Sequence, residues 1–210
     1  MFPLGSVLFP HMPVLLRVFE KRYLAMLAQI LQDEPSEFGI TLIERGQEVG
    51  GGERRFSVGT VAQITQMDAA EQFVVLVAEG DRRIEVIEWL EEDPYPRARV
   101  RVLPDMVWDD ELVPLSERAE AVVRRTLALA SEFSDQQWSA AVELDDDPLT
   151  AAWQLAAISP LGELDQLALL GATSLKELLD GIISHTLAAE ETLRAAWDDP
   201  DSPDSSADES

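Results

Sequence analysis

Two histidines and no cysteine limit the chemistry open to this chain of 210 residues. His11 lies in a short loop bounded by Pro10 and Pro13, and His185 lies far along the chain in a helix-forming stretch. A histidine-based catalytic or metal site needs the imidazole to converge with other ligands or with a nucleophile. Without cysteine, disulfides, thiolate metal sites and a cysteine nucleophile are excluded. The sequence therefore predicts neither a catalytic histidine nor a metal centre.

The remaining catalytic motifs are incomplete. The only lysines, Lys21 and Lys176, fall on predicted helices with charged neighbours, which does not favour a desolvated general base. The run Gly50–Gly52 lacks the Gly-Lys-Ser/Thr ending of a phosphate-binding loop and predicts a hairpin turn instead. The run Asp145–Asp147 lacks the central glycine and distal glutamate of a calcium loop. We predict that the chain is not an enzyme and has no cofactor.

The net charge of −24 is unevenly spread along the chain. Residues 1–105 carry 17 acidic and 11 basic side chains, whereas the remainder carries 23 acidic and 5 basic ones. Such a field repels nucleic acids and anionic membranes. One candidate basic patch comprises Arg97, Arg99 and Arg101, with Arg82 and Arg83 nearby, but this alternation is more typical of a solvated sheet face. The expected partners are proteins.

Neither a membrane span nor a secretory signal is expected. No apolar run approaches the roughly 20 residues needed to cross a bilayer. The amino terminus, Met1–Gly5, lacks the basic region that opens a secretory signal. The sequence therefore predicts a cytoplasmic location.

Short apolar runs rich in β-branched residues fill the chain up to Asp105 and predict strands. The runs are residues 14–19, 38–43, 56–64, 73–78, 84–87 and 98–103. Turns are expected at Met67–Ala70 and Glu79–Asp81, so the sheet should be mostly antiparallel. One helix, residues 20–32, is expected to interrupt the strands and cover the sheet. A small barrel or closed sheet fits this pattern best.

After Pro114 the apolar period changes to that of helices. Helices are expected over residues 116–132, 134–144, 149–158, 161–170 and 174–197. Asp147 is the expected cap of the third, and Ser174 with Glu177 has the spacing of a capping box for the last. Residues 198–210 hold six acids, two prolines and no base, which predicts a disordered acidic tail. The chain thus divides into a β part (1–105), a helical bundle (106–197) and a tail (198–210).

The order of motifs in the first part resembles the amino-terminal domain of the Lon protease family. The matching segments are Pro3–Pro10 with Pro13–Leu16, Val18–Tyr23, Phe38–Ile40, Gly59–Ile64, Glu79–Ile84, and Tyr95–Asp105. Gly5-Ser6 stands where that family commonly has Arg-Asp, and His11-Met12 replaces a more usual glycine-containing loop. The helical part is similar in layout to the helices that follow in the same family.

The resemblance implies an α+β fold, a PUA-like β pseudobarrel with one inserted helix followed by a C-terminal α-helical bundle. It also implies that the chain corresponds to the part of Lon that engages substrate polypeptides. Neither a Walker motif nor the Ser-Lys peptidase segment occurs, so a stand-alone member without ATPase or peptidase domains is expected.

The leading hypothesis is a non-catalytic polypeptide-binding or adaptor module, and an RNA-binding PUA-like protein is the alternative. Proline-bounded loops and amphipathic aromatic residues suit peptide contact. The candidate partner-binding residues are Phe9, Pro10, His11, Met12, Pro13, Phe19, Arg22 and Tyr23.

Overall fold

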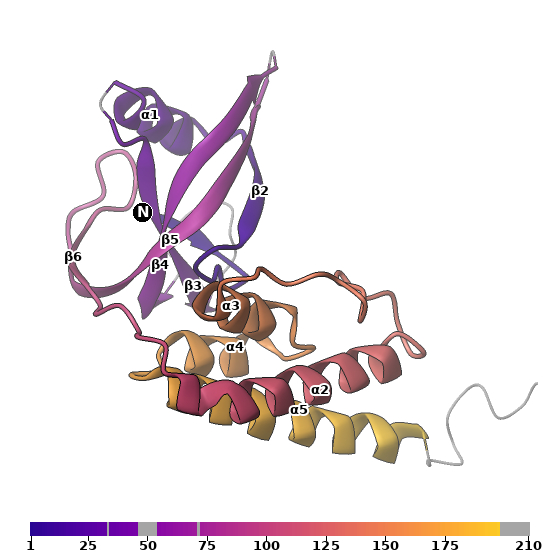
Figure 1. Ribbon diagram of the computed structural model, residues 1–210. Helices are drawn as coiled ribbons and strands as arrows, with labels where there is room; N and C mark the ends of the chain where they lie inside the picture. The colour runs from indigo at the N-terminus through magenta and orange to yellow at the C-terminus, as the bar shows by residue number, and fades with distance from the viewer. Residues whose placement is uncertain (33, 46–53, 71, 198–210) are drawn as a thin grey trace, which may run out of the picture.

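The computed structural model describes residues 1–32, 34–45, 54–70 and 72–197. Within these ranges a curled sheet with one helix comes first, and a group of helices follows (Figure 1). The predicted α+β class is confirmed. The turn expected at Gly50–Gly52 and the tail expected at residues 198–210 lie outside the described residues. In the described part of the chain, no helix is both long and apolar enough to cross a membrane.

Six strands form one sheet that curls into a half-barrel. The strands are β1 (Phe2–Leu4), β2 (Pro13–Val18), β3 (Glu37–Arg45), β4 (Arg54–Ala69), β5 (Val74–Trp89) and β6 (Ala98–Val102). Their order is β1-β3-β4-β5-β2, and β6 pairs with β5 away from this path. All the pairs are antiparallel except that of β1 with β3. Because β1 and β2 each have a single partner, they form the two edges of the curled sheet.

The strands β4 and β5 are longer than the sequence predicted. The turn expected at Glu79–Asp81 is wrong, because β5 continues through these residues without a break. A Cβ at Gly80 would lie 2.1 Å from the carbonyl oxygen of Phe9, so the glycine allows the loop before β2 to pass directly against β5. The turn expected at Met67–Ala70 lies slightly later, because β4 continues to Ala69 and the Ala70 N–H then donates to the Phe73 carbonyl at 2.9 Å.

Helix α1 (Lys21–Ile30) covers one opening of the half-barrel (Figure 1). Its buried side chains are Tyr23, Met26 and Leu27, which recur at helical spacing and face the sheet. The Tyr23 ring stacks on Phe2 of β1, with ring centroids 4.2 Å apart. This helix therefore fixes the position of the first strand as well as closing the core.

The second part of the chain is helical. Its elements are a short 3-10 helix η1 (Asp110–Leu112), α2 (Val113–Ala130), α3 (Pro148–Ile158), α4 (Glu163–Leu170) and α5 (Leu175–Trp197). Helices α2 and α5 lie side by side along one side of the molecule, and α3 and α4 lie between them and the sheet (Figure 1). The Asp147 carboxylate accepts from the Thr150 N–H at 2.9 Å, so the predicted cap is confirmed.

The helix expected over residues 134–144 is wrong. The segment between α2 and α3 contains turns but no helix, and its carbonyl groups bond to a side chain instead. Arg124 of α2 donates to the carbonyl oxygens of Ala140 (2.6 Å) and Val142 (3.0 Å). A guanidinium supplies several donors in a fixed fork, so it can hold a non-helical segment against a helix. We name residues 131–147 the strap.

Arg83 joins the two parts, which we call the β half (1–105) and the helical half (106–197). Its guanidinium donates to the carbonyl oxygens of Leu170 (2.9 Å), Ala172 (2.6 Å) and Pro104 (3.1 Å). Arg83 was considered as a neighbour of the candidate basic patch, but its side chain is buried and donates to carbonyl groups, so it does not contribute to that patch. Trp153 of α3 lies beside it, with its ring centroid 5.0 Å from the guanidinium carbon.

Candidate functional site

A groove opens where the two edges of the curled sheet face each other. Its volume is about 260 Å³, and its walls come from β1, β2 and the first turn of α1. The lining residues are Phe2, Leu4, Leu15, Leu16, Arg17, Val18, Phe19, Glu20 and Tyr23. We call it the seam groove. Since most of these side chains are apolar, covering the groove with an apolar partner lowers the free energy of the system.

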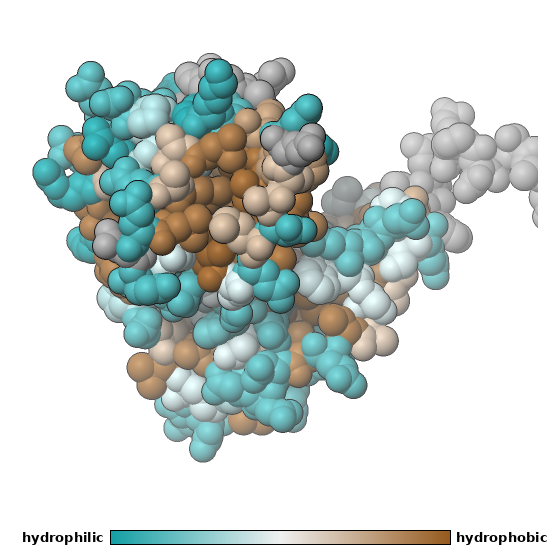
Figure 2. All heavy atoms as spheres, turned by 90° about the horizontal axis from the view of Figure 1, so that it is seen from above, coloured by the Kyte–Doolittle hydropathy of each residue, from teal (hydrophilic) through white to brown (hydrophobic). Residues whose placement is uncertain are grey.

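Two lining side chains project from the rim into solvent. Leu15 is 70% exposed and Phe19 is 51% exposed, whereas Leu16 and Val18 point inward and are buried. This alternation follows from the period of two along a strand. Viewed from above, the molecule shows a broad apolar area ringed by hydrophilic side chains (Figure 2). Exposed apolar surface gathered in this way is typical of a protein-interaction site.

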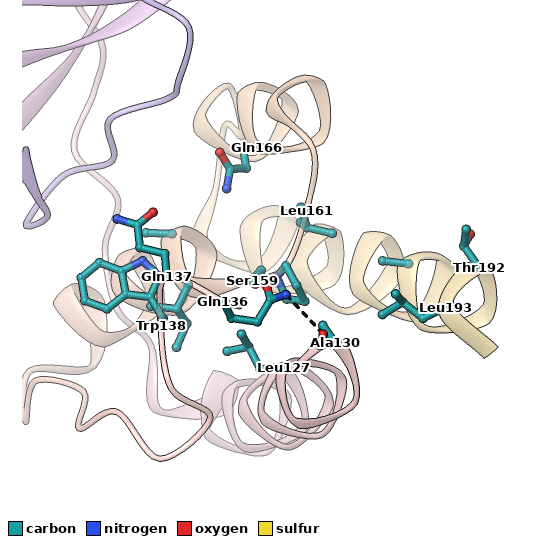
Figure 3. A pocket seen from close by; sticks show the side chains of 14 residues that line it. Leu127, Ala130, Gln136, Gln137, Trp138, Ser159, Leu161, Gln166, Thr192 and Leu193 are labelled. Carbon is teal, nitrogen blue, oxygen red and sulfur yellow. Dashed lines mark hydrogen bonds between the residues drawn. The ribbon is translucent and has the colours of Figure 1, made fainter. Parts of the chain in front are cut away.

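Two further cavities follow the seam groove toward the helical half, each sharing lining residues with the one before it. A cavity of about 320 Å³ shares Leu4 and Leu15 with it and reaches Trp138 of the strap. A third cavity of about 450 Å³ lies between the strap and the helices α2, α4 and α5 (Figure 3). Gln137, Trp138 and Gln166 line both of these cavities. The cavities therefore form one series that starts at α1 and ends in the helical half.

The strap is positioned by a side-chain hydrogen bond at its start. Gln136 donates to the carbonyl oxygen of Ala130, at the end of α2, over 3.3 Å (Figure 3). Trp138 and Gln137 then lie next to each other at one end of the third cavity (Figure 3). Because Trp138 is only partly buried, its ring can serve as apolar surface at the point where the cavities meet.

Cations beside the seam groove stack on aromatic rings. The guanidinium carbon of Arg17 lies 3.9 Å from the centroid of the Phe73 ring. Arg22 lies 4.5 Å from the Tyr23 ring centroid, and its Nε is 3.3 Å from a carboxylate oxygen of Glu20. These contacts hold both guanidinium groups against neighbouring side chains, although Nη2 of Arg22 is buried without a hydrogen-bond partner among the described residues.

The eight predicted partner-binding residues lie at different depths. Phe19 and Tyr23 line the seam groove, and Phe9, Met12 and Pro13 line the second cavity. Phe9 and Tyr23 are only 1% and 2% exposed, so they support these walls from the core.

The other three predicted residues lie outside both of these cavities. Pro10 is buried, Arg22 is partly buried, and His11 is exposed with a φ of 61°. A positive φ is uncommon for a residue other than glycine, although histidine adopts it more readily than most. His11 lines a separate cavity of about 180 Å³ beside Trp138.

Sequence reasoning missed Leu15 and Trp138. Leu15 sits in a run that is apolar at successive positions, Val14 to Leu16, so a strand here carries apolar side chains on both faces, and those on a face that nothing covers are exposed. That signal was present in the sequence, but the edge position of β2 was not. Trp138 falls within residues 134–144, which were expected to form a helix, and the strap instead carries it to the cavities.

Three arginines of the candidate basic patch are paired with carboxylates, whereas Arg97 donates to the Glu91 carbonyl oxygen at 3.4 Å. The Arg99 Nη1 lies 2.7 Å from a carboxylate oxygen of Glu88, and Arg101 pairs with Glu85 on the neighbouring strand. Arg82 pairs with Glu37 of β3 and with Asp81. Paired surface charges leave little net positive field for phosphate groups.

Burial lowers the pKa of the Met1 amino group to about 5, and the carboxyl groups with a lowered pKa owe it to hydrogen bonds and ion pairs. Hydrogen bonds from Thr150 lower the pKa of Asp147, and hydrogen bonds from Thr173 lower that of Glu177. The Arg125 guanidinium lowers the pKa of Glu190. In the described ranges, no three or more side chains of His, Cys, Asp and Glu converge as a metal site would require. None of these groups lies in the seam groove.

Comparison with protein families and curated sequences gives one consistent result. The model of the family described as the ATP-dependent protease La (LON) substrate-binding domain matches residues 1–187. The chain is 29% identical over 132 residues to the Lon protease of Anaeromyxobacter dehalogenans, which is 61% of this chain and 16% of that protein. It is 23% identical over 190 residues to the Lon protease of Koribacter versatilis, 86% of this chain and 22% of that protein. The chain thus spans less than a quarter of the length of either relative.

Solved structures with the same arrangement cover almost the whole fold. The Lon N-terminal domain protein from Xanthomonas campestris has a TM-score of 0.61 and 26% sequence identity, over 87% of this chain and 95% of that one. The N-terminal domain of Mycobacterium avium complex Lon protease has a TM-score of 0.60 over 88% and 96% of the two chains. At 19% identity, the second likeness is one of fold alone.

Proposed function

The chain belongs to the family of the Lon substrate-binding domain, and we propose that it is a non-catalytic module that binds exposed apolar segments of other polypeptides. The observation that carries this proposal is the seam groove, an open apolar groove with Leu15 and Phe19 on its rim. Adaptor activity and a cytoplasmic location belong to the same proposal.

The physical basis of selection is the difference between folded and unfolded proteins. A folded protein buries its large apolar side chains, whereas an unfolded one presents them at many places along the chain. Covering apolar surface contributes about 25 cal/mol per Å². A groove lined by apolar groups therefore distinguishes unfolded from folded polypeptides more than it distinguishes one amino-acid sequence from another.

The non-catalytic part of the proposal is supported by what surrounds the titratable groups. Each described group with a lowered carboxyl pKa caps a helix or pairs with an arginine, and none faces a cavity together with a nucleophile. The RNA-binding alternative has no comparable support, because Arg99, Arg101 and Arg82 pair with carboxylates.

A binding titration tests the proposal. The probe is a small cysteine-containing protein kept unfolded by reduction and carboxamidomethylation, which adds no charge, and the same protein in its native form is the comparison. We expect saturable binding of the unfolded form and none of the native form, with fluorescence anisotropy as the readout. Equal binding of both forms, or of neither, would contradict the proposed function.

Replacing Leu15 with aspartate should weaken this binding by about tenfold, as loss of a central apolar contact does in other interfaces. The matched control is Leu164→Asp, because Leu164 is 67% exposed, close to the 70% of Leu15, and lies on α4 outside the seam groove. The control should bind as the parent does. Similar losses in both variants would show that the added charge, and not the groove, is responsible.

A further inference from the structure

One edge of β2 is hydrogen-bonded to β5, and the other is open. The Gly80 N–H donates to the Met12 carbonyl at 2.9 Å and the Gly80 carbonyl accepts from the His11 N–H at 2.7 Å, so the Met12 carbonyl faces β5. The register of β2 and β5 continues as Val14 with Ala78, Leu16 with Leu76 and Val18 with Val74. Successive residues of a strand direct their backbone groups to opposite sides, so Val14, Leu16 and Val18 direct theirs to β5, as Met12 does. The N–H and C=O groups of Leu15 and Arg17 therefore point away from β5, toward the seam.

Pro13 fits the same alternation. It lies two residues before Leu15, so its backbone groups point to the same side as those of Leu15 and Arg17. The proline nitrogen, which has no hydrogen to donate, therefore lies on the open side, where a strand tolerates proline. Among the residues that the structure describes, none bonds to the backbone groups that Leu15 and Arg17 direct to the seam. Open strand edges are templates for pairing and are usually blocked.

The opposite wall of the seam groove is apolar. It is formed by Phe2 and Leu4 of β1, which is only three residues long and has Pro3 at its centre. This wall offers side chains more than backbone donors. A ligand in the seam groove therefore meets hydrogen-bonding groups at every second residue on one side and apolar side chains on the other.

We propose that an extended segment of the client polypeptide adds to the open edge of β2 as a further strand, with every second side chain directed into the seam groove. This inference rests on the proposed function and specifies how the same site recognises its ligand. Only a polypeptide backbone presents donors and acceptors at the spacing that Leu15 and Arg17 require. Because backbone groups are common to all sequences, strand addition accounts for a site that accepts many clients.

A peptide with blocked backbone positions tests this mode. The parent probe is a seven-residue peptide that alternates leucine or valine with threonine and carries lysine at both ends. Two derivatives are N-methylated, one at the odd and one at the even positions, and a strand edge uses only one of these sets. We expect one derivative to bind at least about tenfold more weakly than the other, which should stay within about threefold of the parent.

The protein side is tested by a pair of variants at one position. Arg17→Ala removes only the side chain, whereas Arg17→Pro also removes the N–H that faces the seam, at an edge position where proline is tolerated. We expect Arg17→Pro to bind the parent peptide about tenfold more weakly than Arg17→Ala does, with the melting temperatures of both variants as a check of folding. Equal affinity of the two variants would overturn the inference.

The outcomes separate this inference from the proposed function. Equal affinities of the two methylated derivatives, whether both strong or both weak, would overturn strand addition. Binding of the unfolded protein without binding of the parent peptide would also overturn it, while leaving polypeptide binding intact. If neither the unfolded protein nor the peptide binds, the proposed function fails.

Discussion

Arg83 shows how far a single residue can be predicted from its neighbours in the sequence. The alternation of Arg83, Ile84, Glu85 and Val86 correctly predicts a strand, but it does not predict that the Arg83 side chain is buried. Its carbonyl partners Leu170 and Ala172 are far away in the chain, so no local pattern relates them to Arg83. Burial lowers the pKa of Arg83, although its carbonyl partners satisfy the guanidinium.

Replacing Arg83 with alanine should destabilise the protein by about 2–4 kcal/mol, because three carbonyl groups lose a charged donor. The control is the adjacent Arg82→Ala, which removes a partly exposed ion pair with Glu37 and should cost less than about 1 kcal/mol. Urea denaturation measures both. Equal losses would contradict the role assigned to Arg83.

At the scale of elements, the long strands depend on close approach of the backbone. Both Gly59 and Gly80 lie where a Cβ would be 2.1 Å from a carbonyl oxygen, that of Ile40 and that of Phe9 respectively. Local pattern treats a glycine between two apolar runs as a turn, and that reading was wrong at Gly80. Helix ends were more predictable, since Asp147 and Ser174 act through neighbours three residues away.

Gly80→Ala should destabilise the fold by at least about 2 kcal/mol, because the new methyl group would overlap the Phe9 carbonyl and push the loop before β2 off β5. Gly171→Ala is the control, since its nearest atoms would be at the ordinary distance of 3.5 Å. The control should change the free energy of unfolding by less than about 0.5 kcal/mol. A neutral Gly80→Ala would show that the loop does not need this approach.

The ion pair between α2 and α5 makes a contribution to stability that depends on pH, and the lowered pKa of Glu190 gives the direction of that dependence. Glu190 of α5 accepts from Arg125 of α2 at 2.6 Å, and its pKa is lowered from the ordinary value of 4.5. A carboxyl group whose folded pKa is lowered stabilises the fold above its unfolded pKa, and loses that contribution as the pH falls through the folded pKa.

Glu190→Gln should therefore reduce the free energy of unfolding at pH 7 and make progressively less difference as the pH falls below about 4.5. Chemical denaturation over a series of pH values measures the difference between variant and parent. Glu191→Gln, an exposed neighbour, is the control. A difference for Glu190→Gln that stays constant with pH would contradict the assigned ion pair.

At the scale of the whole molecule, the order of motifs was the most informative property of the sequence. It predicted membership of the Lon amino-terminal domain family and the α+β fold, and both are confirmed. The seam groove could not be predicted in the same way. It exists because β1 pairs in parallel with β3 while β2 pairs with β5, and these pairings join segments that no local pattern relates.

The division at residue 105 stays a proposal. Arg83 and the contact of Phe9 with Trp153, whose ring centroids are 6.2 Å apart, join the β half to the helical half. The series of cavities also runs across this boundary, from β1 and β2 to the strap. We propose that the two halves act together in binding, with the helical half extending the seam groove.

The most direct test of polypeptide binding at the seam groove is an NMR titration of the isotope-labelled chain with the carboxamidomethylated unfolded protein. We predict that the largest backbone amide shift changes occur in β1, in β2 and at Phe19, extending to Trp138 of the strap. Changes confined to β6 and the helical half, with β2 unaffected, would contradict the account.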